Sequence, residues 1–425
     1  MKRLPGRTLG ALLLLLSIAS PSPAQKPDRY LALARRVLRT TPLVDGHNDL
    51  PWRIREDSIV HGDVEAYDLG KATPGMTDIA RLHQGLVGAQ FWSIYIPGEI
   101  KDSGFARVQL EQFDIARRTI AKYPRALRWV TSSAGIRSAF AAHRIGSLLG
   151  LEGGHAIENS LGALRIYYEL GARYMTLTHN VTLDWADAAL DEPKHGGLTP
   201  FGEEVVREMN RLGMLVDLSH VSPGTMSAAL NVTEAPVIFS HSAARALVDH
   251  RRNVPDSILV RLPKNGGIVM VPFVTSFVSA ALHAWDDSIA AVRRMAQQQL
   301  GGDTAAVRRQ VDAWSARLPR PHVTIADVAD HIEHIRKVAG VEHVGIGSDF
   351  DGITDTVDGL EDVSTFPALF AELARRGWKE AELRKLAGEN LLRVFAQAER
   401  VSARLRKSRA PSTKTIQQLD RPAPH

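Results

Sequence analysis

The 425-residue sequence contains no cysteine. This absence excludes a disulfide framework, thiolate metal ligands, a cysteine nucleophile and a lipid-modified N-terminal cysteine. Any metal site in the chain must therefore use histidine and carboxylate side chains. Three common catalytic patterns are also absent, since the sequence has no HExxH, no GxSxG and no P-loop motif.

Long apolar runs are missing from the body of the chain, and the one such run lies at the N-terminus. Basic residues at positions 2, 3 and 7 precede an apolar stretch from Leu9 to Ile18, and Ser22-Pro23-Ala24 follows. An uncleaved anchor helix is the alternative, but the stretch is short for a bilayer span. We expect residues 1–24 to be a signal peptide removed before Gln25. The mature protein is then exported, into a periplasm or the medium, without a transmembrane segment.

Charge is unevenly distributed along the chain. The formal net charge is +5, and it falls to +2 when the three basic residues of positions 1–24 are removed. Residues 400–425 hold seven Lys or Arg against the single acid Asp420, a balance of +6, so residues 25–399 carry about −4. A negatively charged body argues against nucleic-acid partners. We expect residues 400–425 to form a basic, disordered tail; contact with an anionic envelope surface is the alternative.

Eight short runs rich in Val, Ile and Leu recur along the chain, each followed by a turn-forming cluster and then a helical pattern. This rhythm is typical of parallel strands in βα units. The predicted strands are Leu43–Asp45, Leu86–Ile96, Ile145–Leu151, Tyr174–Thr178, Met214–Leu218, Val237–Ser240, Ile268–Phe273 and Val344–Gly347.

Eight such units predict an α/β fold, a (β/α)8 TIM barrel over residues 25–399. Phe201–Leu212 is a predicted amphipathic helix between two strands, capped by Thr199-Pro200. The seventh and eighth strands are too far apart for a simple crossover, and the stretch His283–Arg317 is charged and helical in pattern. We interpret residues from about 280 to 322 as an insertion; an irregular extension of one outer helix is the alternative.

Ionisable residues follow six of the eight predicted strands. In such barrels the reacting groups lie at the C-terminal ends of the strands, so these side chains should meet. Histidines and acids gathered without a cation would repel or stay unsatisfied, which favours zinc or a similar divalent ion. These residues are His47 and Asp49 after the first strand, Glu152 after the third, His179 after the fourth, His220 after the fifth, His241 after the sixth and Asp349 after the eighth.

Local spacing suggests how two ions could be held. Alternation along an extended chain directs His47 and Asp49 to the same side, so both can reach one ion. Glu152 stands beside glycines that permit close backbone approach, as expected for a carboxylate that bridges two ions. His220 and His241 would complete the shell of the second ion.

Seven segments, in the same order, closely resemble the membrane (renal) dipeptidase family. They span residues 44–352, and together they are highly specific. The segments are Val44–Trp52, Leu151–His155, Leu177–Asn180, Asp217–Ser222, Phe239–Ser242, Arg251–Pro255 and Gly347–Gly352.

The resemblance implies a metal-dependent hydrolase barrel with two zinc ions per subunit. It implies that His47 and Asp49 bind the first ion, that His220 and His241 bind the second, and that Glu152 bridges them. It further implies that His179 contacts the substrate, that Arg252 binds the substrate carboxylate, and that Asp349 lies beside the bridging water.

The activity implied is hydrolysis of short dipeptides, including those with a C-terminal D-residue, by a hydroxide that bridges the two ions. In this hypothesis His179 donates to the oxyanion and Asp349 moves the proton to the leaving amine. A noncovalent homodimer is also implied. Animal members have cysteines and a lipid-anchor signal that this chain lacks, so membrane anchorage and a disulfide-linked dimer are not carried over.

Two alternatives remain beside the dipeptidase hypothesis. Fold and metal do not fix the substrate, so the chain could be another amidohydrolase, such as a deaminase, a lactonase or an N-acyl-amino-acid hydrolase. A second alternative is a catalytically silent zinc-binding module. The presence of His179, Asp349 and the complete ligand set argues against the silent module.

Overall fold

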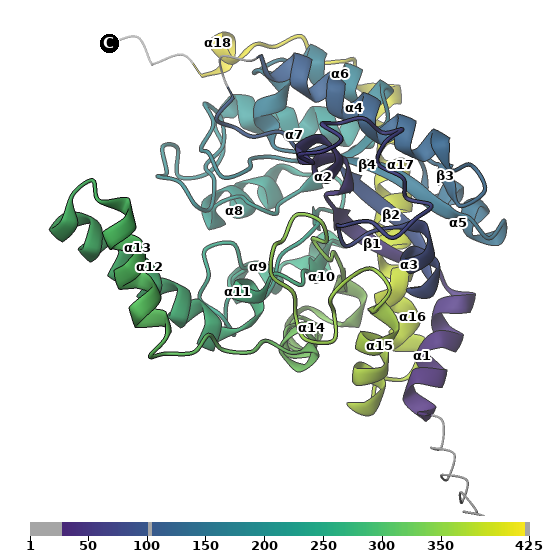
Figure 1. Cartoon of the computed structure of the whole chain (residues 1–425). Coiled ribbons are helices and arrows are strands. Elements are labelled where there is room, and N and C mark those ends of the chain that lie inside the picture. The colour runs from purple at the N-terminus through teal and green to yellow at the C-terminus, as the bar shows by residue number, and fades with distance from the viewer. Residues whose placement is uncertain (1–27, 101–103, 421–425) are drawn as a thin grey trace, which may run out of the picture.

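The computed structural model of the chain describes residues 28–100 and 104–420. The predicted signal peptide, residues 1–24, lies outside the described residues. Eight parallel strands form a closed barrel in which β2 pairs with both β1 and β4, and β9 pairs with β8 and β1 (Figure 1). The predicted α/β barrel is therefore confirmed. Its strands are β1 Leu43–Asn48, β2 Val87–Ser93, β4 Ile145–Glu152, β5 Ala172–Thr176, β6 Leu215–Asp217, β7 Ile238–Phe239, β8 Ile268–Val271 and β9 Val344–Ile346.

A ninth strand, β3 (Leu127–Trp129), was not predicted. It pairs with Ile145–Ser147 at the start of β4, whose later residues Leu149–Glu152 pair with β5. Only Leu127 of its three residues is fully buried. So short and half-exposed a strand lacks the apolar run by which the other strands are recognised.

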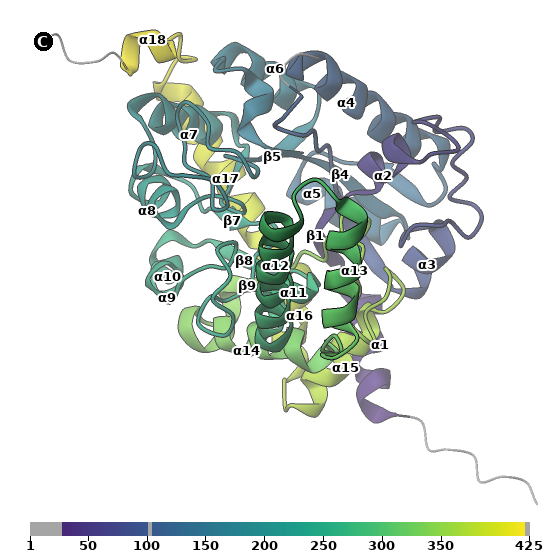
Figure 2. The same ribbon diagram turned by 60° about the vertical axis from the view of Figure 1, so that its left-hand side comes forward.

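Helices surround the barrel (Figures 1 and 2). None of those in the described residues combines the length and apolar character needed to cross a bilayer. The helices are α1 Arg29–Thr40, α2 Leu50–Glu56, α3 Ile79–Gln84, α4 Phe105–Lys122, α5 Ser133–Ala141, α6 Leu161–Glu169, α7 Pro200–Leu212, α8 Pro223–Val232, α9 Asp256–Leu259, α10 Leu262–Asn265, α11 Thr275–Val278, α12 Ala280–Leu300, α13 Thr304–Ser315, α14 Ile325–Ala339, α15 Phe366–Arg375, α16 Glu380–Arg384, α17 Asn390–Ser408 and α18 Ile416–Leu419, with the short turns η2 Gly154–Ile157, η3 Val341–His343 and η4 Lys385–Glu389.

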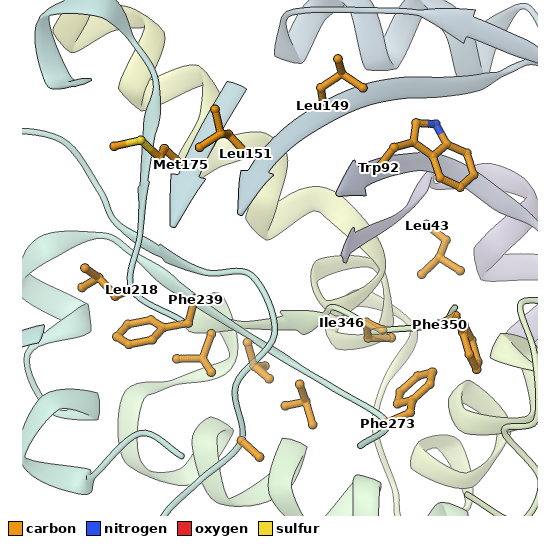
Figure 3. Packing of buried hydrophobic residues seen from close by; sticks show 14 of the residues in the cluster. Leu43, Trp92, Leu149, Leu151, Met175, Leu218, Phe239, Phe273, Ile346 and Phe350 are labelled. Carbon is orange, nitrogen blue, oxygen red and sulfur yellow. The ribbon is translucent and has the colours of Figure 1, made fainter. Parts of the chain in front are cut away.

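Alternate residues of each strand face two different apolar cores. In β4, Leu149 and Leu151 belong to the larger core, shown in Figure 3, whereas Leu148 belongs to a second core that also contains Phe91 and Tyr174. This alternation follows from the two-residue period of an extended strand. Both faces of the sheet are thus buried, as is usual for parallel strands.

Helix α17 covers the end of the barrel where the strands begin. Its Asn390 donates to the carbonyls of Val341 and Val344 at 2.7 and 2.9 Å, next to the start of β9. The Phe395 ring lies 6.5 Å from that of Phe91 in the second core. One end of the barrel is therefore closed by packing, and the C-terminal strand ends are left for the site.

Helix α7 begins as predicted. The side chain of Thr199 accepts a hydrogen bond from the backbone N–H of Gly202 at 3.2 Å, and Pro200 occupies the first turn. The helix ends at Leu212 and is followed by the capping residue Gly213, which has a φ of 84°. A left-handed residue at this position is the usual helix stop, and glycine adopts it without steric cost.

The stretch His283–Arg317 is helical, as predicted, and forms the hairpin of α12 and α13. Figure 1 shows this hairpin projecting from the barrel, and Figure 2 shows its two helices side by side. The Trp285 and Trp314 rings lie 6.0 Å apart between the two helices, and Val307 and Val311 of α13 are buried. The two helices pack mainly on each other, which is why the hairpin stands clear of the barrel.

The expectation of a disordered tail is wrong for residues 400–420. Helix α17 continues to Ser408, with Val401 and Leu405 buried, and α18 follows. Arg406 donates to the carbonyls of Arg211 and Leu212 at the end of α7, at 3.1 and 2.8 Å. The prediction relied on the many basic residues of this segment. It overlooked the apolar residues, spaced at the period of a helix, that pack against the rest of the protein.

Candidate metal centre

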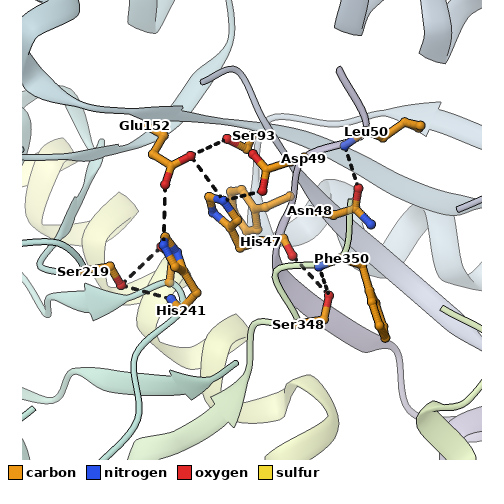
Figure 4. A network of polar contacts seen from close by, with 12 residues as sticks. His47, Asn48, Asp49, Leu50, Ser93, Glu152, Ser219, His241, Ser348 and Phe350 are labelled. Atoms are coloured by element: carbon orange, nitrogen blue, oxygen red, sulfur yellow. Dashed lines mark hydrogen bonds and ion pairs between the residues drawn. The ribbon is translucent and has the colours of Figure 1, made fainter. Parts of the chain in front are cut away.

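Glu152, the last residue of β4, lies at the centre of a cluster of histidines (Figure 4). Its Oε2 is 3.3 Å from Nε2 of His47, and its Oε1 is 3.0 and 3.5 Å from Nε2 of His220 and His241. Asp49 Oδ2 approaches the same His47 nitrogen at 3.2 Å. The two carboxylate oxygens thus face different histidines.

The other predicted residues join the same centre. His179 Nε2 lies 3.8 Å from Glu152 Oε1. Arg252 lines the same cavity, of about 650 Å³. All eight side chains predicted from the sequence therefore meet at one end of the barrel. Candidate ligand atoms lie within 4.8 Å of one another in three overlapping sets, which are His47, Glu152 and His241; Glu152, His179 and His220; and His47, Asp49 and Asp349.

Two of these residues have a left-handed backbone. His220 and Asp349 follow β6 and β9 and have φ values of 66° and 68°. Such values are uncommon outside glycine and cost on the order of 1–3 kcal/mol each. The turn they make at the strand end carries both side chains into the cluster. Strain of this kind is concentrated at functional sites.

His47 is oriented by a tyrosine from the opposite side of the barrel interior. Its Nδ1 lies 2.8 Å from the Tyr174 hydroxyl, so its Nε2 faces the two carboxylates. The tyrosine ring packs directly against Gly150. A Cβ at that position would lie 1.9 Å from Cζ of the ring. A side chain at position 150 would displace Tyr174 and release His47.

The donor set fits a divalent cation. Nε2 of His220 and Nε2 of His241 are only 2.8 Å apart. His220 Nδ1 contacts the Asn180 Oδ1 at 3.1 Å, and an amide oxygen only accepts, so the His220 proton lies on Nδ1. A bare nitrogen so close to a second ring nitrogen and to a carboxylate is the arrangement that a bound cation stabilises. Nitrogen and oxygen donors without sulfur suit zinc or a similar ion.

Burial sets the charge state of most groups in the centre. It holds the pKa of His220 and of His241 well below the usual range, and it lowers the pKa of His179 to about 4. Burial also raises the pKa of Asp349 well above its usual range. These three rings are therefore neutral at neutral pH, which is the protonation state that metal binding requires.

For His47 and Glu152, neighbouring charges outweigh the effect of burial on the pKa. Burial disfavours charge on His47, yet Tyr174, Glu152 and Asp49 hold its pKa well above the usual range. Burial likewise opposes ionisation of Glu152, but the adjacent His47 and His220 keep its pKa well below the usual range. The ionised carboxylate thus attracts positive charge to the middle of the cluster.

The positively charged side chain of Arg252 lies on the cavity wall and forms no ion pair within the described residues. The residue is 1% exposed, and its Nε and Nη1 make no hydrogen bond within the described residues. Its guanidinium carbon lies 5.2 Å from the centre of the Phe277 ring. Burial lowers its pKa to about 10, so it stays charged at neutral pH. A buried guanidinium with free donors is suited to binding a carboxylate.

Sequence reasoning missed the residues that support this centre. Tyr174 and Asn180 contact the histidines, and Asp217 and Ser240 lie behind them. Asp217 did carry a signal, since it is an acid inside an apolar strand. Tyr174 carried none, because tyrosine is an ordinary strand residue.

A parallel eight-stranded barrel with a histidine–carboxylate cluster at its C-terminal strand ends defines the class of metal-dependent hydrolase barrels. The family model for membrane dipeptidase (peptidase family M19) matches residues 31–409. Dipeptidase 3 of Rattus norvegicus is 44% identical over 378 residues, which is 88% of this chain and 68% of that protein. The chain therefore belongs to the membrane dipeptidase family, whose members are metallopeptidases that hydrolyse peptide bonds.

Solved structures of lower identity share the fold. The probable dipeptidase PvdM of Pseudomonas aeruginosa is 22% identical with a TM-score of 0.76, and the match covers 88% of this chain and all of that one. A metallopeptidase from Rhodobacter sphaeroides, solved with a phosphinate mimic of the dipeptide L-Ala-D-Ala, is 24% identical with a TM-score of 0.68 over 84% of this chain and 99% of that one.

Proposed function

We propose that the protein is an exported dipeptidase with two zinc ions that cleaves free dipeptides. The observation that carries the proposal is the combination, in one cavity of about 650 Å³, of the histidine–carboxylate cluster and the unpaired Arg252. The cluster provides the ligands for hydrolytic metal chemistry, and the arginine provides a binding group for a free C-terminus. Family membership supports the same activity.

The residues present divide naturally between two ions. His47 and Asp49 would hold one, His220 and His241 the other, and Glu152 both, because its two oxygens face these two groups. When bound, the pair would supply a shared water of lowered pKa, whose hydroxide is the nucleophile, and would polarise the scissile carbonyl.

The chain's own side chains would perform the remaining steps. Arg252, which lines the cavity, would bind the substrate carboxylate through its guanidinium group and so place the peptide bond over the cluster. His179, whose ring nitrogen lies 3.8 Å from Glu152, would donate a hydrogen bond to the developing oxyanion. Asp349 would take the proton of the water and pass it to the leaving amine.

Two finer features complete the proposal. Dipeptides with a C-terminal D-residue are proposed as substrates, and the support is the L-Ala-D-Ala mimic bound by the structurally similar Rhodobacter sphaeroides metallopeptidase. Export is proposed from the signal-like sequence of residues 1–24. Mass spectrometry of the exported protein should find Gln25 at its N-terminus, whereas retention of residues 1–24 would contradict a cleaved signal.

The direct test is release of amino acids by the purified protein from L,L and L,D dipeptides, dipeptide amides, tripeptides and N-acyl amino acids. The assay is run on untreated protein, after chelation, and after zinc is restored. We expect metal-dependent cleavage of dipeptides and much slower cleavage of dipeptide amides, which lack the anion for Arg252. Preferred turnover of N-acyl amino acids would instead indicate another amidohydrolase activity.

A further inference from the structure

Two buried aspartates bind serines on the neighbouring strand ends in the same way. Asp45 accepts hydrogen bonds from the backbone N–H and the hydroxyl of Ser348 at 2.7 and 2.6 Å. Asp217 accepts the same pair from Ser240 at 2.8 and 2.6 Å. All four residues are fully buried, and each serine directly precedes a residue of the metal centre. We call these pairs the Asp45–Ser348 clamp and the Asp217–Ser240 clamp.

The Asp217–Ser240 clamp fixes the direction of its hydrogen bonds. Besides the two bonds from Ser240, Asp217 accepts one from the Ser219 N–H at 3.1 Å and one from the Thr176 hydroxyl at 2.7 Å. A carboxylate surrounded by four donors acts only as an acceptor. The single hydroxyl proton of Ser240 is therefore committed to Asp217.

This direction determines the proton position on His241. The Ser240 oxygen lies 2.8 Å from Nδ1 of His241. Since the Ser240 proton points to Asp217, the serine oxygen must accept from Nδ1–H of the ring. The other ring nitrogen, Nε2, then carries a lone pair, and it faces Glu152 Oε1 at 3.5 Å.

The Asp45–Ser348 clamp provides a natural comparison. Its serine hydroxyl makes an equally short bond to the aspartate and lies 3.2 Å from the backbone carbonyl of His47, but it contacts no imidazole nitrogen in the described part of the chain. Removing this hydroxyl should reduce stability about as much as removing that of Ser240. It should not change the tautomer of any histidine.

We infer that Asp217 and Ser240 are positioning residues that hold His241 in the Nδ1–H tautomer, so that Nε2 is free to bind a divalent cation. This inference rests on the metal centre of the proposed function. Outer partners of metal-binding histidines commonly act in this way, and their loss typically weakens metal binding 10- to 100-fold.

The Asp217→Asn variant tests the inference with almost no change in shape. An amide nitrogen facing Ser240 donates where the carboxylate accepted, so the serine proton turns to His241 and the ring proton moves to Nε2. In the metal-free protein labelled with ¹⁵N-histidine, long-range ¹H–¹⁵N spectra should show His241 as the Nδ1–H tautomer in the wild type and as the Nε2–H tautomer in Asp217→Asn. An unchanged tautomer would overturn the inference, whatever the metal content.

Zinc affinity, measured by competition with a chelator, gives the second readout. We expect Asp217→Asn and Ser240→Ala to bind one of two zinc ions about 10- to 100-fold more weakly. Ser240→Thr, which keeps the hydroxyl, should bind it nearly as tightly as the wild type. Ser348→Ala should lose comparable thermal stability with a much smaller change in zinc affinity than Ser240→Ala.

The outcomes separate this inference from the proposed function. Equal zinc affinities in Ser240→Ala and Ser348→Ala would overturn the inference, because the Asp217–Ser240 clamp would then be purely structural. A wild-type protein that binds no zinc would contradict the proposed function itself, while the tautomer spectra would still report on Asp217 and Ser240.

Discussion

Neutral histidine rings serve as structural connectors in this chain as well as candidate ligands. On α14, Nδ1 of His331 accepts a hydrogen bond from the Ala244 N–H at 3.0 Å, and its Nε2 lies 3.3 Å from the Val278 carbonyl. The ring is 1% exposed. A proton added at Nδ1 would face another proton, so this connection requires an uncharged ring.

We predict that His331 makes stability fall in acid. Burial lowers its pKa to about 4, from about 6.5 in the unfolded chain. The unfolded state therefore binds more protons between these values, and stability is lost as pH falls from 6.5 toward 4, by about 1.4 kcal/mol per unit from this residue. Denaturant unfolding should show a shallower pH dependence for His331→Asn, which keeps an acceptor for Ala244. Parallel curves for the two proteins would contradict this assignment.

The site residues could be predicted from sequence because each follows a recognisable strand. His220, His241 and Asp349 stand within two residues of the end of an apolar run, and the barrel geometry brings all strand ends together. Tyr174 and Ser240 could not be predicted. Their roles depend on which strands are neighbours and which way a hydroxyl points, and neither property is encoded in local spacing.

At the scale of elements, helix α7 is fixed at both ends by the C-terminal segment. Ser402 and Arg406 of α17 donate to carbonyls at its C-terminus. At its N-terminus, Asp420 accepts from the Thr199 hydroxyl at 2.6 Å and from the Phe201 N–H at 2.8 Å. A carboxylate at the start of a helix satisfies free N–H groups and interacts favourably with the helix dipole.

We predict that Asp420→Ala lowers the free energy of unfolding by about 1 kcal/mol, the typical cost of losing such a cap. Denaturant unfolding measures this loss. Asp114→Ala is the matched control, because among the described residues Asp114 makes only an exposed pair with Arg118 and its removal should change stability by less than about 0.5 kcal/mol. Equal effects of the two substitutions would show that residues 409–420 do not hold α7.

Element prediction succeeded where periodicity and caps were strong, as for Thr199-Pro200 at the start of α7. It failed for β3, which is three residues long, and for residues 400–420. In the tail, seven basic residues dominated the composition and concealed the buried stripe that includes Val401 and Leu405. This segment is ordered because it packs against α7, and such a long-range contact cannot be recognised from local sequence.

In the whole molecule, the packing that closes the barrel and the polar cluster of the candidate site lie at opposite ends of the strands. Helix α17 packs over the starts of the strands, and the strand ends are left to carry the polar cluster. Both faces of the sheet are buried, so the barrel can hold strained residues such as His220 and Asp349 in position. The α12–α13 hairpin projects from the barrel (Figure 1) without contributing a residue to the cluster in the described part of the chain.

The proposed function requires that one bimetallic cluster performs dipeptide hydrolysis. Its most direct test is stepwise addition of zinc to chelated protein, with bound metal and hydrolysis of L-Ala-L-Ala followed together. We expect negligible turnover without metal and full turnover when two equivalents are bound. Undiminished turnover in fully chelated protein, or two tightly bound ions without turnover of any dipeptide, would contradict it.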